Sequence, residues 1–456
     1  MQRIDEKTWS PVSWRSFPIK QMPNYSDKEK LEQAFSELRQ YPPLVSSWEI
    51  EELKNKLAKA ARGEAFLLQG GDCAETFADC NSPHIVKLLK VLLQMSFIML
   101  HEMNISIVRV GRIAGQYAKP RSQDTERIDN TDYPIYRGDI INSYEADLND
   151  RQPDPRRLID AYHKAGLTLN FLRALTDGGG FTDLHHPEYW ELDFMRKNEY
   201  YREYESMVNS ITNAIRFMEG ILPSELITLR QVDFYVSHEA LNLYYDSAQT
   251  RTVPHKKGYY NLSTHMPWIG NRTRALKDAH VEYCRGIKNP VGLKVGPPYD
   301  ISEIIDVIKT INPTNEEGKM VLITRFGQGR VLNELPKLIE SVMQENLNVL
   351  WSCDPMHGNT FATDDGIKTR DFNAILTDIK ETFEVHRNLK THLGGVHLEM
   401  TGEDVTECVG GANGLEANGL KSNYKSFCDP RLNYEQSLEM AFLISKEWKK
   451  NKELAK

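Results

Sequence analysis

The stretch Pro290–Ile311, PVGLKVGPPYDISEIIDVIKTI, joins a short apolar segment to an amphipathic one. PVGLKVG is bounded by proline and glycine and rich in apolar residues, which is typical of a buried parallel strand. ISEIIDVIKTI repeats isoleucine and valine at helical spacing. The same step follows at once, because KMVLITRFG at 319–327 precedes VLNELPKLIESVMQEN at 331–346. A repeated strand-to-helix unit predicts a parallel sheet covered by helices.

About eight such steps run through the chain, which is the number in a (β/α)8 TIM barrel, an α/β fold. A doubly wound open sheet would alternate similarly, but no GxGxxG turn follows the first strand, and this disfavours its dinucleotide-binding version. We expect an N-terminal extension at 1–60 packed on a catalytic barrel at 61–456, with a helical insertion at 123–225 after the second strand. The expected strands lie at residues 65–73, 105–114, 232–238, 258–270, 290–296, 319–327, 348–358 and 393–402.

Charge and composition exclude several classes of protein. The chain has 456 residues and a formal net charge of −8, which argues against a general binder of nucleic acid or acidic membranes. We see no apolar run near the ~18 residues that a membrane span needs, and no apolar signal region at the N-terminus. The six cysteines form no CxxC pair, so we expect reduced thiols and a cytoplasmic location.

Four side chains of metal-ligating type fall at or near predicted strand ends, where a barrel places its active site. Cys73 in LQGGDCAETF follows the first strand, and His357 in DPMHGN follows the seventh. Glu399 lies within the apolar eighth strand, where a carboxylate is costly unless it is paired or metal-bound. Asp429 lies in the next loop. Simpler interpretations remain open: Cys73 as a core thiol, His357 as a residue that braces a loop, and Asp429 as a helix cap. His397 is a competing ligand, because it lies on the strand face of Glu399.

A second group of candidate residues is cationic. In AKPRS, Ala118–Ser122, a lysine, an arginine and a hydroxyl surround a proline, and this group suits a phosphate or carboxylate, although a solvated basic loop has the same composition. Several cations at one barrel mouth in an acidic protein predict a strongly anionic, multiply phosphorylated substrate. The cations are Arg112, Lys119, Arg121, Arg272, Lys294 and Arg325. We interpret the pair His185–His186 in FTDLHHPEYWELDF as an aromatic-rich packing motif.

Eight segments in order carry a recognisable pattern: LQGGDCAETF, GQYAKPRS, GGFTDLHHPEYW, WIGNRTR, NPVGLKVGP, DPMHGNT, GGVHLEMTGEDVTECVGG and DPRLN. From about Trp9 to the final helix, they resemble the class II (plant-like) 3-deoxy-D-arabino-heptulosonate 7-phosphate (DAHP) synthases. The resemblance implies a TIM barrel and a metal-dependent transferase. Such an enzyme condenses phosphoenolpyruvate with erythrose 4-phosphate and releases phosphate, in the first step of the shikimate pathway to aromatic amino acids. We also expect a homo-oligomer, which is common among cytosolic enzymes.

The resemblance also implies residue roles. The metal ligands would be Cys73, His357, Glu399 and Asp429. This mixed thiolate, imidazole and carboxylate set fits Mn, Co, Fe or Zn better than Mg, and we favour Mn. Lys119 is the candidate for proton transfer, and Arg121 and Ser122 would hold the phosphate of erythrose 4-phosphate. The phosphoenolpyruvate site would consist of Arg112, Lys119, Arg272, Lys294 and Arg325.

Two positions depart from the family pattern. Asn271 stands in WIGNRTR where a glutamate is usual, and Phe326 stands in TRFGQGR where a methionine is usual. Loss of a carboxylate beside Arg272 would alter the charge near the phosphoenolpyruvate phosphate. Three other functions stay open: a DAHP synthase dedicated to a secondary-metabolite pathway, a sugar-phosphate aldolase or hydrolase with Cys73 as nucleophile, and a non-catalytic homologue that binds phosphorylated ligands.

Overall fold

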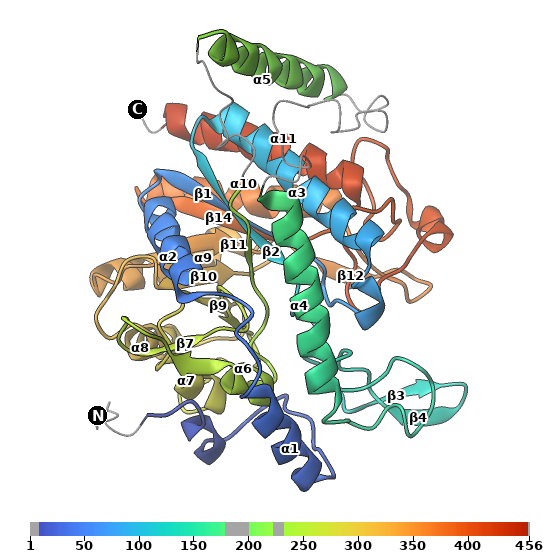
Figure 1. Cartoon of the computed structure of the whole chain (residues 1–456). Coiled ribbons are helices and arrows are strands. Elements are labelled where there is room, and N and C mark those ends of the chain that lie inside the picture. The colour runs from blue at the N-terminus through green and yellow to red at the C-terminus, as the bar shows by residue number, and fades with distance from the viewer. Residues whose placement is uncertain (1–8, 178–199, 222–231, 455–456) are drawn as a thin grey trace.

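The computed structural model describes residues 9–177, 200–221 and 232–454. At its centre lies an eight-stranded sheet in which hydrogen-bonded neighbours run parallel (Figure 1). Burial on both faces explains why these strands are almost wholly apolar. They are β1 (Ala65–Gly71), β2 (Ser106–Arg112), β5 (Tyr235–Val236), β8 (Trp268–Ile269), β9 (Val291–Val295), β10 (Met320–Thr324), β11 (Leu350–Cys353) and β14 (Leu393–Glu399).

The strand order shows that the sheet curls round on itself. The order is β5-β2-β1-β14-β11-β10-β9-β8, so the first strand of the sheet pairs with the last and the others follow in chain order. A parallel bridge between Glu239 and Trp268 links the segments that follow β5 to β8. Its hydrogen bonds run from Trp268 N–H to the His238 carbonyl and from Ala240 N–H to the Trp268 carbonyl, both 3.0 Å. The α/β class is confirmed and the arrangement is TIM-like, because a doubly wound sheet would not pair its first strand with its last.

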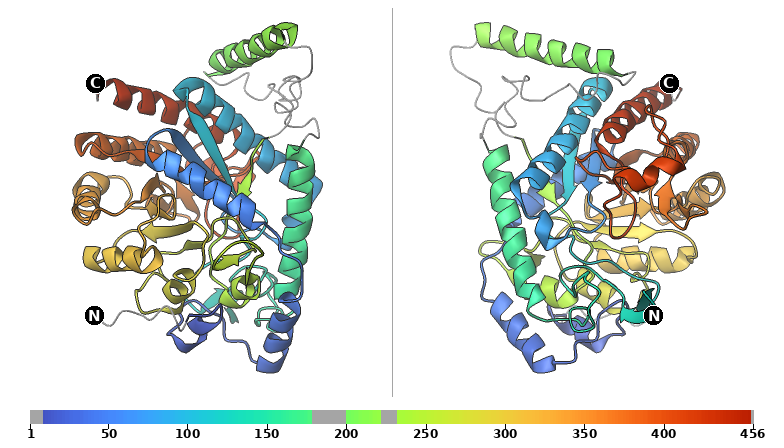
Figure 2. Two further views of the ribbon diagram at one scale, coloured as in Figure 1. Left: turned by 60° about the vertical axis from the view of Figure 1, so that its left-hand side comes forward. Right: turned by 90° about the vertical axis from the view of Figure 1, so that its right-hand side faces the viewer.

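Helices cover the outside of the sheet (Figures 1 and 2). They include α3 (Ser82–Met103), α7 (Ala279–Cys284), α8 (Ile301–Ile311), α9 (Val331–Gln344), α10 (Phe372–Asn388) and α11 (Tyr434–Leu454). Helix α3 corrects the expectation that no apolar run approaches the length of a membrane span, because its length and composition alone would allow one. However, 72% of that apolar window is buried within the fold, where α3 packs beside α11. We therefore interpret α3 as a core helix.

Helix α2 (Ser47–Ala61) packs against the starts of the barrel strands. Ser46 and Glu49 form a capping box at its N-terminus. Leu53 and Leu57 of α2 join one apolar cluster with interior strand residues such as Leu67. The loops that follow the strands lie at the opposite end of the sheet.

Two predicted elements differ from the structure. The strand expected at 258–270 is divided into β7 (Tyr259–Asn261), which pairs antiparallel with β6 (Thr250–Thr252), and β8. Polar residues at the end of β7 and just beyond it explain this, because the side chains of Asn261 and Ser263 bond the buried Asp246 carboxylate. The insertion opens with a hairpin, not a helix: β3 (Thr125–Ile128) and β4 (Thr131–Pro134) flank a left-handed turn. Helices α4 (Arg157–Thr176) and α5 (Tyr201–Ile221) follow.

The remaining elements are short: 3-10 turns at Ser13–Ser16, Phe77–Asp79 and Ala417–Ser422, the helices α1 (Lys28–Leu38) and α6 (Leu243–Ala248), and the hairpin of β12 (Thr360–Ala362) with β13 (Lys368–Arg370). The motif with His185 and His186 lies outside the described residues.

Candidate active site

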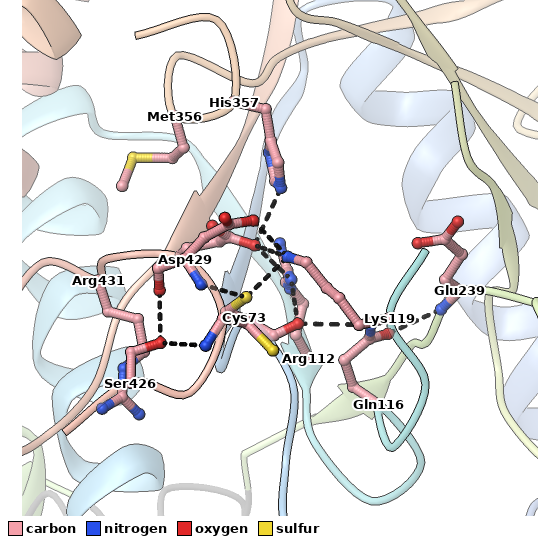
Figure 3. A network of polar contacts seen from close by, with 12 residues as sticks. Cys73, Arg112, Gln116, Lys119, Glu239, Met356, His357, Ser426, Asp429 and Arg431 are labelled. Carbon is pink, nitrogen blue, oxygen red and sulfur yellow. Dashed lines mark hydrogen bonds and ion pairs between the residues drawn. The ribbon is translucent and has the colours of Figure 1, made fainter. Parts of the chain in front are cut away.

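Three of the four predicted metal ligands converge where β1 and β14 end. Cys73 lies two residues beyond β1, and Glu399 ends β14 directly opposite Gly71. With Asp429, they bring one thiol and two carboxylate donor atoms within 4.8 Å of one another. The fourth, His357, reaches the cluster with Nε2 3.0 Å from Glu399 Oε1. Figure 3 shows Cys73, His357 and Asp429 converging from separate segments.

The chemistry of this donor set fits a transition metal, because a thiol, an imidazole and two carboxylates all ligate such ions. Burial would raise the pKa of Glu399, but His357 and the nearby lysine and arginine cations outweigh it and hold that pKa well below its usual value. Burial raises the pKa of the Cys73 thiol well above its usual value. Because a ligating cysteine must be a thiolate, metal binding here would release a proton.

Asp354 orients His357. Asp354 Oδ2 lies 2.7 Å from His357 Nδ1, so the opposite ring nitrogen is turned toward Glu399. Carboxylate–histidine pairs of this kind fix the imidazole tautomer at metal sites. Sequence analysis missed Asp354, although it stands three residues before His357 in the same DPMH motif.

His397 is not available as a ligand. Its Nδ1 lies 2.8 Å from Gln69 Oε1, and its Nε2 lies 2.8 Å from Arg112 Nη1. Both ring nitrogens are thus occupied, and burial lowers the pKa of His397 well below its usual value. Of the two candidates on this strand face, the structure turns Glu399 toward the cluster and leaves His397 holding Arg112.

Lys119 lies among the ligands themselves. Its Nζ is 2.7 Å from Cys73 Sγ, 2.6 Å from Asp429 Oδ2 and 3.6 Å from Glu399 Oε1 (Figure 3). Burial would lower the pKa of Lys119, but the anionic groups around it outweigh that effect and raise the pKa well above its usual value. The residue therefore carries a proton within this cluster.

A pocket of about 430 Å³ opens beside the cluster. Cys73, His357 and Asp429 form part of its wall. Every residue predicted to bind substrate also lines it, so the structure brings the cationic group together: Arg112, Lys119, Arg121, Ser122, Arg272, Lys294 and Arg325.

Protein contacts fix these cations in different ways. Arg112 is buried and donates to Glu399 Oε1 at 2.9 Å, while Lys294 Nζ lies 3.0 Å from Asp354 Oδ2. Arg325 donates to the His357 carbonyl at 3.0 Å. Arg272 is exposed at the rim and donates to Ser122 Oγ at 2.9 Å. The pocket therefore has cations held by protein contacts inside and an exposed arginine, Arg272, at its edge.

Four buried polar atoms around this pocket have no hydrogen-bond partner within the described part of the chain: Arg112 Nε, Arg325 Nε, Trp268 Nε1 and Glu239 Oε1. Buried polar groups are normally paired, so these atoms favour contact with a ligand or water. Sequence analysis missed Trp268 and Glu239, which flank the seam of the sheet. The Trp268 ring also makes cation–π contacts with two side chains, because the charged groups of Arg112 and Lys294 lie 5.3 and 5.7 Å from its centre.

Comparison with known proteins agrees with this site. The Class-II DAHP synthetase family matches residues 9–445 of the chain. A phospho-2-dehydro-3-deoxyheptonate aldolase of Neurospora crassa is 45% identical over 460 residues, which covers 97% of this chain and 95% of that protein. A protein of the same name from Streptomyces coelicolor is 44% identical over 439 residues, covering 96% of this chain and 97% of that protein. The chain therefore belongs to the Class-II DAHP synthetase family.

Proposed function

We propose that this chain is a DAHP synthase, which condenses phosphoenolpyruvate with erythrose 4-phosphate and releases phosphate. That reaction is the first step of the shikimate pathway. The observation that carries the proposal is that donor atoms of Cys73, Glu399 and Asp429 lie within 4.8 Å of one another, beside a cation-lined pocket whose wall includes Cys73 and Asp429. A metal and two phosphorylated substrates would need this combination.

The first task of the residues is to gather two anions that repel each other. Arg112, Lys294 and Arg325 form the inner part of the proposed phosphoenolpyruvate site, and their fixed contacts mean that little ordering is needed on binding. Arg121, Ser122 and Arg272 at the rim are proposed to hold the phosphate of erythrose 4-phosphate. Holding two reactants in register can contribute about 7–11 kcal/mol to lowering the barrel enzyme's activation barrier.

The second task is chemical. Carbon 3 of phosphoenolpyruvate attacks the aldehyde carbon, water adds at carbon 2, and phosphate leaves with cleavage of its carbon–oxygen bond. When bound by Cys73, His357, Glu399 and Asp429, a divalent metal supplies Lewis acidity to the aldehyde oxygen. Lys119 holds a proton beside this donor set and is our candidate to protonate the new hydroxyl group. Glu239 presents an unpaired oxygen to the pocket, which suits it to position the water.

An assay on metal-stripped protein tests the proposal. Consumption of phosphoenolpyruvate should require both erythrose 4-phosphate and added metal, and Mn is the metal that we expect to restore most activity. Cys73→Ala should lower metal affinity and activity together. Cys284→Ala removes another buried free thiol, one outside the pocket lining, and should leave metal affinity unchanged. Full activity in EDTA-treated protein would exclude the metal mechanism, and turnover without erythrose 4-phosphate would exclude the reaction.

Further parts of the proposal concern the whole chain. We assign a full (β/α)8 barrel to residues 61–456, with residues 1–60 as an extension and 123–225 as an insertion after the second strand. We also propose a cytoplasmic location, which the six free thiols support because they suit a reducing compartment. A homo-oligomer also stays a prediction, and light scattering of the purified protein tests it.

A further inference from the structure

We propose that Lys119 and the divalent metal compete for the same donor atoms, so that metal binding displaces the Lys119 ammonium group from Cys73, Asp429 and Glu399 toward the substrate pocket. This inference rests on the metal site of the proposed function. It adds a role for Lys119 that is separate from proton transfer, namely coupling metal binding to substrate binding.

The competition follows from the contacts of one atom. Lys119 Nζ approaches the Cys73 sulfur, an Asp429 oxygen and a Glu399 oxygen at 2.7, 2.6 and 3.6 Å. These are the three donor atoms that lie close enough together to hold an ion. Within the described residues, the ammonium group's contacts all fall in this set, so it is a single cation coordinated by the proposed metal ligands. Two cations sharing three donors at such distances would repel each other strongly.

Of the lysine and arginine side chains that contact Glu399 among the described residues, Lys119 is the one able to leave. Arg112 is held by His397 and the Cys73 carbonyl as well as by Glu399. Arg370 is fully buried and is held by Thr360 and the Pro430 carbonyl as well as by Glu399. Lys119 has no such second anchor for its ammonium group among the described residues. Its side chain has four methylene groups, and it already lines the pocket.

The adjacent pocket would stabilise the displaced ammonium group. The adjacent pocket is built to receive phosphorylated anions, so a bound anion would attract Lys119 away from the ligands. Metal and anion should therefore each strengthen the binding of the other, since coupling between two sites is reciprocal. Removing the competing ammonium group should remove this part of the coupling.

The experiment measures metal binding, not turnover. Mn²⁺ affinity of metal-stripped protein is measured by calorimetry for the wild type, Lys119→Met and Lys119→Arg. Lys119→Met keeps a side chain of similar length without charge, and we expect it to bind Mn²⁺ about tenfold more tightly, within the usual range of site couplings. Lys119→Arg keeps a cation and should bind Mn²⁺ with an affinity near that of the wild type. Phosphoenolpyruvate should tighten Mn²⁺ binding in the wild type and do so less in Lys119→Met.

Lys368 provides the matched control. Its Nζ lies 3.6 Å from Asp429 Oδ1 but contacts neither of the other two donors, and its side chain is 55% exposed. Lys368→Met removes the same charge from the same pocket and should change Mn²⁺ affinity much less than Lys119→Met. If Mn²⁺ bound equally more tightly to Lys368→Met and Lys119→Met, the loss of one positive charge from the pocket would explain the effect, and competition for the donor atoms would be excluded. Unchanged or weaker Mn²⁺ binding in Lys119→Met would overturn the inference, whereas failure of the wild type to bind Mn²⁺ would overturn the metal site of the proposed function.

Discussion

Asp354 and His357 form a buried pair in which Asp354 Oδ2 lies 2.7 Å from His357 Nδ1. Asp354 also contacts Lys294 at 3.0 Å, so one carboxylate links a proposed metal ligand to a proposed substrate-binding cation. Interactions with His357 and Lys294 outweigh the effect of burial and hold the pKa of Asp354 well below its usual value. The proposed metal ligands and the pocket are thus joined through a residue that does not itself line the pocket.

Asp354→Asn should weaken metal binding. The amide keeps the shape of the side chain, but it loses the negative charge that fixes the His357 tautomer and offsets Lys294. Losses of such supporting groups usually cost roughly 10- to 100-fold in metal affinity or activity, and we expect a Mn²⁺ affinity reduced within that range. Calorimetry with Mn²⁺ checks this. Asp371→Asn, which keeps the N-cap of α10, is the control, and an affinity loss equal to that of Asp354→Asn would contradict the specific role.

Asn271→Glu should impair phosphoenolpyruvate binding more than turnover. Asn271 Oδ1 accepts hydrogen bonds from Gly296 N–H at 3.0 Å and from Arg274 Nε at 3.1 Å, and the residue lines the pocket. Both partners are donors, so the amide oxygen must face them. A glutamate could accept the same bonds but would add negative charge to an anion site. We expect KM for phosphoenolpyruvate to rise about tenfold, equivalent to about 1.4 kcal/mol, with a smaller change in kcat.

Steady-state kinetics of Asn271→Glu and Asn271→Ala separate charge from positioning. Asn271→Ala removes the acceptor without adding charge, so it should disturb the loop after β9 and lower kcat more than Asn271→Glu does. A KM for phosphoenolpyruvate in Asn271→Glu equal to that of the wild type would show that residue 271 does not face the bound anion.

Glu75→Gln should loosen the loop that carries Lys119. The Glu75 carboxylate is buried and accepts hydrogen bonds from three successive backbone N–H groups, those of Ala114, Gly115 and Gln116, at 2.9, 2.9 and 2.7 Å. A glutamine would turn an N–H donor toward one of these donors. We expect a loss of about 1–3 kcal/mol in the free energy of unfolding and a lower kcat, measured by urea denaturation and steady-state kinetics. Glu64→Gln, at an exposed site, should change neither quantity; equal effects there would contradict the prediction.

The sequence could predict that Cys73 and Glu399 lie at strand ends because that position depends on the strand pattern alone, while their role as metal ligands stays a prediction. Cys73 and Glu399 lie at the ends of apolar runs, and parallel strands place their carboxyl ends at one mouth. The pairing of Gly71 with Glu399 then brings the two side chains together. The seam near β5 and β8 was harder to predict, because each of these strands has only two residues and polar residues nearby, such as Ser263, bond to side chains.

The sequence also could not predict which side chains contact one another. The contact of Lys119 with Asp429 at 2.6 Å was not predicted, because no spacing reveals that the two loops meet, while its role in binding substrate stays a prediction. His397 was left as a competing ligand, because strand alternation places it on the face of Glu399 but cannot show that Gln69 and Arg112 occupy its ring nitrogens. Such outcomes depend on contacts between segments hundreds of residues apart.

Stability should fall at alkaline pH through His84. His84 Nε2 lies 2.8 Å from Asp72 Oδ2, and Asp72 in turn contacts Arg431 at 2.6 Å, so Asp72 ties the loop at Cys73 both to helix α3 and to the loop at Asp429. Burial would lower the pKa of His84, but the carboxylates of Asp72 and Asp79 outweigh it and raise the pKa from 6.5 to about 9. The charged form is therefore stabilised by folding.

This raised pKa fixes the sign of the pH effect. The contribution of His84 is present in full below its unfolded pKa of 6.5 and is lost as pH rises through the folded value of about 9. A shift of this size corresponds to at most about 3 kcal/mol. Urea unfolding at about pH 6 and about pH 10 should show a larger loss for the wild type than for His84→Gln. His101→Gln, an exposed position on the same helix, should keep the wild-type difference. The same pH dependence in His84→Gln and the wild type would show that the pair with Asp72 does not carry the effect.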